Sequence, residues 1–232
     1  MEYSNIVTAI FLKRPNRFIA HCLVDGMEVI SHVKNTGRCA ELLVPGCTVY
    51  LEHAPSPKRK TDYSLVAVQK GELLINMDSQ IPNGAAYEAL VSKALKLPGI
   101  EEEFSLIRRE FKYGNSRIDL YLETVSGQKV LVEVKGVTLE RGGIALFPDA
   151  PTTRGTKHIY ELIKAVEDGY LAYILFVIQF KPVSHFEPNA VTDPDLASAL
   201  LAAAQSGVGV LAVDCAVTKE CMVIKDFVNV KL

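Results

Sequence analysis

The feature that most constrains the fold is a pair of alternating apolar runs in residues 117–138, which read RIDLYLETVSGQKVLVEVKGVT. A short polar segment, residues 124–128, separates the two runs and contains Gly127. Alternation with a period of two on both sides of such a turn predicts a β-hairpin. Successive side chains of a strand point to opposite faces of the sheet, so each run is expected to have one aliphatic face and one mixed face.

The polar side chains of this hairpin are expected to meet on its mixed face. With a turn centred near Ser126, Asp119 lies directly across from Glu133, and Lys135 lies one step further along the same face. Two carboxylates and one ammonium together outline a metal site. The opposite face is expected to carry only aliphatic side chains, namely Ile118, Leu120, Leu122, Val130, Val132 and Val134.

This trio of side chains suits phosphodiester hydrolysis. Two carboxylates can hold Mg²⁺ or Mn²⁺ while leaving coordination positions for water and a phosphate oxygen, and a lysine stabilises developing charge. An Asp followed by Glu-x-Lys on the next strand resembles the PD-(D/E)xK nuclease superfamily, with Asp119, Glu133 and Lys135 as the catalytic set. The alternative is a solvated strand face with a cross-strand ion pair.

Composition indicates a folded protein without a global preference for polyanions. The 232 residues, 49% of them hydrophobic, suffice for a sizeable core. Lys and Arg number 25 against 27 Asp and Glu, so any nucleic-acid binding must come from local patches. The five cysteines have no zinc-type spacing, and the N-terminus does not resemble a signal peptide, so we expect a cytoplasmic protein with reduced thiols. The most apolar run, residues 170–180, is too short to span a membrane and fits a buried parallel strand.

Residues 1–83 are predicted to form an OB-like β-barrel. Six short strand-like runs occur before residue 80, separated by Gly, Pro, Asn and Asp, and closure into a barrel would protect their edges. Basic residues cluster in the turns between these runs. They either form a groove for a phosphate backbone or are simply solvated. The candidate DNA-binding residues of this region are Lys13, Arg14, Arg17, Lys34, Arg38, Lys58, Arg59 and Lys60.

A second domain is predicted over residues 84–232, beginning with a helix at residues 85–97. Glu88 on this helix either adds a third acidic group to the metal site or faces solvent. Residues 104–112 are expected to form a strand that leads into the hairpin, and Arg108 and Arg109 would point to opposite faces of it.

The segment after the hairpin is expected to be loop-rich up to a helix that begins near residue 158. Thr152 or Thr153 can cap this helix, whose first turn favours anions. Arg154, Lys157 and His158 are donors suited to phosphate, although His158 is equally compatible with an ordinary capping or packing role. Asp193 is expected to cap a further helix over residues 194–207.

Set out as elements, residues 84–180 read as helix, three strands, helix and strand. This αβββαβ order is the core of the PD-(D/E)xK fold, with the carboxylates on its second and third strands. One departure is that Ile118, rather than proline, precedes Asp119. The fold class expected for the whole chain is α/β (α+β), an OB-like barrel followed by this nuclease-like domain.

The chain also resembles a specific family. An OB-like N-terminal domain followed by SRIDLYL, VLVEVKGVTL and ALFPDAPTTRGTKHIYEL is similar to the sugar fermentation stimulation protein A (SfsA) family over essentially the whole length. The resemblance implies a DNA-binding protein of weak sequence preference, linked to regulation of sugar and especially maltose metabolism, with a nuclease-like domain. It implies Asp119, Glu133 and Lys135 as the metal-site residues, with Glu88 as a weaker match.

Two functional hypotheses follow, a metal-dependent nuclease and a non-catalytic DNA-binding regulator on the same scaffold. Both need a bound cation, since two bare carboxylates repel a polyanion. The preference for single- or double-stranded DNA depends on whether aromatics such as Phe11, Phe18 or Tyr63 are exposed. The apolar segment at residues 221–232 is compatible with a paired strand or with the interface of a homodimer.

Overall fold

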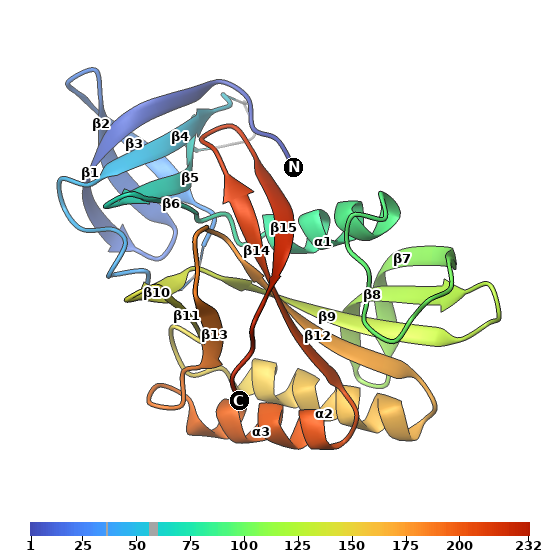
Figure 1. The fold of residues 1–232 in the computed structure, drawn as a ribbon. Helices are drawn as coiled ribbons and strands as arrows, with labels where there is room; N and C mark the ends of the chain where they lie inside the picture. The colour runs from blue at the N-terminus through green and yellow to red at the C-terminus, as the bar shows by residue number, and fades with distance from the viewer. Residues whose placement is uncertain (36, 56–59) are drawn as a thin grey trace.

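A closed β-barrel forms the N-terminal part of the computed structural model, which describes residues 1–35, 37–55 and 60–232. Strands run in the order β3-β2-β1-β4-β5-β6, and a parallel pairing between β3 and β5 closes five of them into the barrel (Figure 1). The predicted OB-like barrel is confirmed. The strands are β1 (Ile6–Asn16), β2 (Ile19–Val24), β3 (Met27–Val33), β4 (Thr48–His53), β5 (Tyr63–Lys70) and β6 (Leu73–Asn76).

The C-terminal domain is built on a mixed sheet in the order β15-β14-β12-β9-β8-β7. Helix α1 packs on one face, while α2 and α3 cover the other, so the sheet has a separate apolar cluster on each side (Figure 1). The predicted αβββαβ order is present. The elements are α1 (Ile81–Val91), β7 (Phe104–Tyr113), β8 (Ser116–Thr124), β9 (Lys129–Val137), α2 (Thr153–Glu167), β12 (Leu171–Ile178), α3 (Pro194–Gln205), β14 (Gly209–Val217) and β15 (Met222–Val228).

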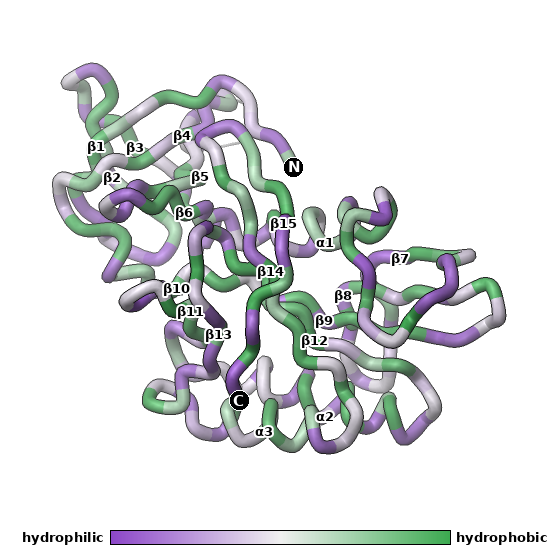
Figure 2. The backbone as a smooth tube through the Cα atoms, viewed as in Figure 1, coloured by the Kyte–Doolittle hydropathy of each residue, from purple (hydrophilic) through white to green (hydrophobic). Residues whose placement is uncertain are grey.

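Strand β12 is the buried centre of this sheet. It pairs in parallel with β9 on one side and with β14 on the other, and its residues contribute to the apolar clusters on both faces of the sheet. Its hydrophobic composition is visible along the tube in Figure 2. A strand covered on both faces reads as a continuous apolar run, as predicted for residues 170–180. Among the described residues, no helix is long and apolar enough to cross a membrane.

Three short strands occupy places that the sequence suggested were loops. Strands β10 (Leu139–Arg141) and β11 (Ile144–Phe147) form a tight hairpin, and β13 (His185–Pro188) pairs in parallel with β11. The hairpin turn is Gly142-Gly143, both with positive φ, which glycine adopts without steric cost. The apolar stretches are only three or four residues long, so glycine and proline punctuation concealed them.

Capping residues fix the positions of α2 and α3. The hydroxyl of Thr152 accepts from the Gly155 amide at 3.0 Å, and the carboxylate of Asp193 accepts from the Leu196 amide at 3.0 Å. Asp193 also accepts from the Thr152 amide at 2.8 Å, so one carboxylate joins the starts of both helices. Both predicted caps are confirmed.

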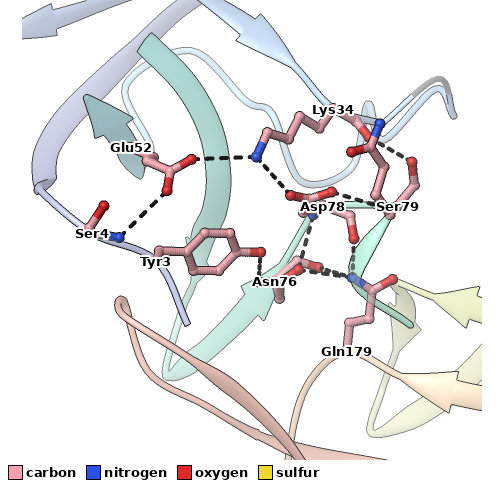
Figure 3. A network of polar contacts seen from close by, with 9 residues as sticks. Tyr3, Ser4, Lys34, Glu52, Asn76, Asp78, Ser79 and Gln179 are labelled. Carbon is pink, nitrogen blue, oxygen red and sulfur yellow. Dashed lines mark hydrogen bonds and ion pairs between the residues drawn. The ribbon is translucent and has the colours of Figure 1, made fainter. Parts of the chain in front are cut away.

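A polar network joins the barrel to the C-terminal domain (Figure 3). Asn76, the last residue of β6, donates its amide to the Gln179 carbonyl at 2.9 Å and receives the Gln179 side-chain amide. Lys34 pairs with Asp78 at 3.1 Å and with Glu52 at 3.4 Å. The barrel is therefore anchored where the chain passes from β6 to α1.

The first residues of the chain also belong to this junction. The Tyr3 amide donates to the Glu220 carbonyl at 2.7 Å, and Glu2 forms a bridge with Cys221, so the segment before β1 pairs with the β14–β15 turn. The Tyr3 hydroxyl then accepts from the Asn76 side chain at 2.8 Å (Figure 3). The chain thus contacts the C-terminal domain both before it enters the barrel and after it leaves.

Candidate metal centre

The hairpin of β8 and β9 has the predicted register. Leu120 lies opposite Val132 and Tyr121 opposite Leu131, which centres the turn on Ser126. Asp119 comes one residue before the paired part of β8. The amide of Val134 donates to the Asp119 carboxylate at 2.8 Å. The side chain of Asp119 therefore accepts the backbone hydrogen bond at the end of the β8–β9 ladder.

Strand β8 departs from regular alternation at Asp119, so Ile118 lies on the other face of the sheet from the one expected. Leu120 and Leu122 belong to the apolar cluster under α1, whereas Ile118 packs in the cluster on the α2 side. On the neighbouring strand β7, Glu110 adopts a φ of 56° and is not part of the β7–β8 ladder, which pairs Arg109 and Phe111 on either side of it. The prediction that Ile118 shares the aliphatic face was wrong, because simple alternation does not continue through this irregular point.

Asp119 is a partly buried carboxylate held by neutral donors. Its Oδ1 accepts from the Asn83 side chain at 2.6 Å, and its Oδ2 accepts from the Val134 amide. Burial, together with the negative charge of Glu133, raises the pKa of Asp119 to about 6, and these hydrogen bonds offset the rise only in part. Asp119 therefore carries negative charge that its protein partners do not fully compensate.

Glu133 is 2% exposed and uses its two oxygens unequally. Its Oε1 accepts from Lys135 Nζ at 2.5 Å and also contacts His158 Nδ1, while Oε2 is buried without a hydrogen-bond partner among the described residues. Burial alone would raise the pKa of Glu133, but the contacts with His158 and Lys135 outweigh it and hold the pKa below its usual value. An ionised carboxylate with one unsatisfied buried oxygen is costly unless a further ligand occupies that position.

This cluster fits a hard divalent cation. The Asp119 and Glu133 carboxylates are close enough for the charge of Glu133 to raise the pKa of Asp119, and Glu133 presents a free buried oxygen, which is the ligand type preferred by Mg²⁺, Mn²⁺ and Ca²⁺. Within the described ranges, no group of three or more His, Cys, Asp or Glu residues is arranged to hold a metal. Such a cation would need further ligands from water, backbone or substrate, as Mg²⁺ usually does.

Two cavities flank the cluster. One of about 520 Å³ lies between the β7–β8 turn and the start of α2, and His158 forms part of its wall beside Arg117, Arg154 and Lys157. The other, of about 100 Å³, lies at the domain junction beside Gly136. A Cβ at Gly136 would come within 2.8 Å of Pro82 Cγ and 2.6 Å of Gln179 Oε1. Glycine therefore lets α1 approach the end of β9 closely enough for Asn83 to reach Asp119.

Glu88 is not in contact with this carboxylate pair. Its carboxylate binds the Met1 amino group at 2.9 Å, and its side chain is half exposed. From α1 it is Asn83 that reaches Asp119. Sequence reasoning missed Asn83 because the QIPNG segment looked like a domain boundary, whereas the structure uses it as the first turn of α1.

The basic residues divide into a structural group and an exposed group. The guanidinium of Arg14 donates to the carbonyls of Arg17, Asn35, Gly37 and Arg38 at 2.6–2.9 Å, and Lys34 is engaged by Asp78 and Glu52. These two side chains hold the barrel together. Lys58 and Arg59 lie outside the described residues. The exposed basic candidates are Lys13, Arg17, Arg38, Lys60, Arg154 and Lys157.

Comparison with known proteins supplies the family. The sequence matches the SfsA N-terminal OB domain over residues 12–77 and the sugar fermentation stimulation protein RE domain, which is restriction-endonuclease-like, over residues 80–221. The chain belongs to the SfsA family. Sugar fermentation stimulation protein homologs from Clostridium beijerinckii and Desulfitobacterium hafniense are 49% and 52% identical to it, covering 100% of this chain and 100% and 99% of theirs.

A solved structure of the SfsA family has the same architecture. The structure of Pyrococcus furiosus SfsA in complex with Ca²⁺ is 31% identical, superposes with a TM-score of 0.87, and covers 100% of this chain and 98% of that chain. The arrangement of an OB barrel and a restriction-endonuclease-like domain, predicted from the sequence, is therefore confirmed.

Proposed function

We propose that this SfsA protein is a divalent-metal-dependent phosphodiesterase that acts on DNA. The observation that carries the proposal is the buried, unpartnered Oε2 of Glu133 beside Asp119, whose pKa is raised. Polar groups are left in this state at functional sites, where a ligand completes them. The presence of Ca²⁺ in the P. furiosus relative supports a divalent cation as that ligand.

In this proposal Asp119 and Glu133 hold Mg²⁺ or Mn²⁺, and Glu88, which binds the Met1 amino group, is not part of the ligand set. The bound ion would supply Lewis acidity at a phosphate oxygen. Asn83 and the Val134 amide keep the Asp119 carboxylate in place. Lys135, whose side chain is 17% exposed, supplies positive charge and donors to orient the attacking water.

The exposed basic side chains provide the path for the DNA backbone. Lys13, Arg17 and Arg38 surround the first turn of the barrel, and Arg154 and Lys157 line the 520 Å³ cavity next to His158. Phe18, in the same barrel turn, is 51% exposed and offers a surface on which a base can stack, whereas Phe11 is buried. This arrangement favours contact with phosphates and unpaired bases over reading of base edges.

A second candidate function is non-catalytic DNA binding that regulates sugar metabolism. It is favoured by one observation, the ion pair of Lys135 with Glu133, which occupies the ammonium that hydrolysis requires. A homodimer is also proposed, since β15 is an edge strand of the large sheet and exposes Phe227. Light scattering of the full-length protein tests the dimer directly.

The deciding experiment measures cleavage and retention of labelled single- and double-stranded DNA with Mg²⁺, Mn²⁺ or EDTA. The parent is compared with Asp119→Asn and Lys135→Ala, and Glu72→Gln, on an exposed turn, serves as the control. We expect metal-dependent cleavage that falls by about 10³-fold or more in both site variants, while DNA retention persists. Retention without cleavage under any metal would establish the non-catalytic alternative.

A further inference from the structure

His158 stands out because the DNA-binding role suggested by the sequence does not account for its position. It is 5% exposed, lies in the second turn of α2, and directs Nδ1 at the Oε1 atom of Glu133 on β9. No described residue is a hydrogen-bond partner of its Nε2. We therefore expect the main effect of His158 to be on the Glu133 carboxylate that it contacts.

The fold holds His158 in place from several directions. Thr152 caps α2, and Asp193 ties this cap to the start of α3. Gly155 allows the close approach, since a Cβ there would lie 2.8 Å from Thr152 Cγ2 and 3.1 Å from Leu196 Cδ1. The His158 imidazole thus lies near the N-terminus of α2, whose position is fixed by these contacts.

The contact determines which oxygen of Glu133 is available. Lys135 and His158 both engage Oε1, and neither engages Oε2. Rotation of the carboxylate would exchange the oxygens, but the two donors come from different elements, β9 and α2, and together they define one orientation. Oε2 of Glu133 is therefore held in a fixed position, so the side chain loses less conformational entropy when an ion binds to it.

We propose that His158 is a positioning residue that orients the Glu133 carboxylate so that Oε2 is presented to the divalent cation. The inference rests on the proposed function only in taking Glu133 as a metal ligand. It needs no cleavage activity. Loss of such a supporting hydrogen bond typically lowers metal affinity about 10–100-fold.

The test measures Ca²⁺ binding to the full chain by titration calorimetry. His158→Leu removes the donor, His158→Asn places an amide donor near the position of Nδ1, and His158→Gln places one near Nε2 instead. His185→Leu is the matched control, because His185 contacts Glu187 at 2.7 Å in a histidine–glutamate pair on β13. We expect about 10–100-fold weaker binding in the Leu and Gln variants, recovery to within about threefold of the parent in the Asn variant, and no change in the control.

The outcomes separate this inference from the nuclease proposal. Ca²⁺ binding as tight in the Leu and Gln variants as in the parent would overturn the role of His158, whether or not the parent cleaves DNA. Weakened binding that Asn restores, in a parent that never cleaves DNA, would support His158 and reject the nuclease. A parent that binds no Ca²⁺ would overturn both. If the Leu variant does not fold, the difference between Asn and Gln decides.

Discussion

Two of the buried sites at which a carboxylate meets a lysine, one at the domain junction and one at the candidate metal centre, are completed in different ways. At the domain junction, Asp78 is 1% exposed, and its oxygens accept from the Gln80 amide at 3.0 Å and pair with Lys34 at 3.1 Å (Figure 3). In the metal centre, Glu133 is equally buried but has one oxygen without a partner. Both oxygens of Asp78 therefore have protein partners, whereas Oε2 of Glu133 has none among the described residues.

The two clusters differ in how many partners their carboxylate oxygens have. Both clusters would look alike in a search for buried charge. Removing a partner from a satisfied pair exposes an uncompensated charge and destabilises the fold, whereas removing charge from an unsatisfied pair relieves the fold and abolishes ligand binding. The following experiments test this contrast, beginning with the largest expected effect on free energy.

Breaking the junction cluster should destabilise the protein strongly. Lys34→Met would leave the Asp78 carboxylate buried without its cation, and we expect the free energy of unfolding to fall by about 3 kcal/mol. Urea unfolding of the metal-free protein measures this. Lys60→Met, which alters an exposed lysine of the same domain, should change stability by less than about 0.5 kcal/mol. Equal effects of the two substitutions would mean that the junction pair is not a structural contact.

The opposite sign is expected at the metal centre. Burial and the charge of Glu133 raise the pKa of Asp119 in the folded protein to about 6, above the usual value of 3.8, so the folded protein retains a proton that the unfolded chain releases at lower pH. Raising the pH from about 4 to about 6 therefore costs stability, and this cost persists at higher pH. Without metal at about pH 7.5, Asp119→Asn should stabilise the protein by about 2 kcal/mol.

This gain should shrink as the pH falls through the same window, since Asp119 in the parent is then protonated. Unfolding of both proteins across this range in EDTA provides the measurement, with Glu72→Gln as the exposed control. A variant less stable than the parent at every pH would show that the hydrogen bonds of Asp119 outweigh its repulsion by Glu133.

The affinity for a divalent cation should fall when Asp119 becomes protonated. Glu133 stays ionised through this range because its pKa is lowered, whereas Asp119 must lose its proton before it can bind a cation. We expect Ca²⁺ to bind about tenfold more weakly at about pH 5 than at about pH 7. Calorimetry in buffers of different ionisation enthalpy would also report the proton released on binding near the lower pH. Affinity that does not depend on pH would exclude Asp119 as a ligand.

The smallest effect is expected in the barrel, where two arginines of the same turn differ in the hydrogen bonds that their side chains make. Arg17 is exposed, so Arg17→Gln should lower the slope of log affinity for DNA against log salt by about 1 and leave stability unchanged. Arg14 donates to four carbonyls, so Arg14→Gln should chiefly lower the melting temperature. Filter binding across salt concentrations and thermal unfolding test the pair. Matching salt slopes in parent and Arg17→Gln would remove Arg17 from the DNA path.

The sequence was most informative where structure is local. Alternation and turn chemistry predicted the hairpin and its register, both of which depend on neighbours within one supersecondary unit. The partners that give the site its character come from further away. Asn83 and His158 lie 36 and 25 residues from the carboxylates they contact, and no periodicity encodes such contacts.

Basic residues illustrate the same limit. Arg14 and Arg17 occur in one short turn and look alike as letters, yet only the structure reveals that the carbonyls of Asn35, Gly37 and Arg38 accept hydrogen bonds from Arg14. Similarly, strict alternation placed Ile118 with Leu120, because the sequence does not indicate that the neighbouring strand has an irregular residue, Glu110, with a φ of 56°. Local pattern predicts elements, but it does not predict where an element is interrupted.

The pairing of residues 2 and 3 with the β14–β15 turn limits how the two domains can be separated or exchanged between proteins. The barrel is continuous in sequence, but the chain segment before it completes the edge of the other domain. A gene fragment cut near residue 83 would separate Glu2 and Tyr3 from Cys221 and Glu220, and would take Asn76 away from Gln179. An exchange of barrels between distant relatives would therefore have to preserve two sets of contacts, those of residues 2 and 3 with the β14–β15 turn and that of Asn76 with Gln179.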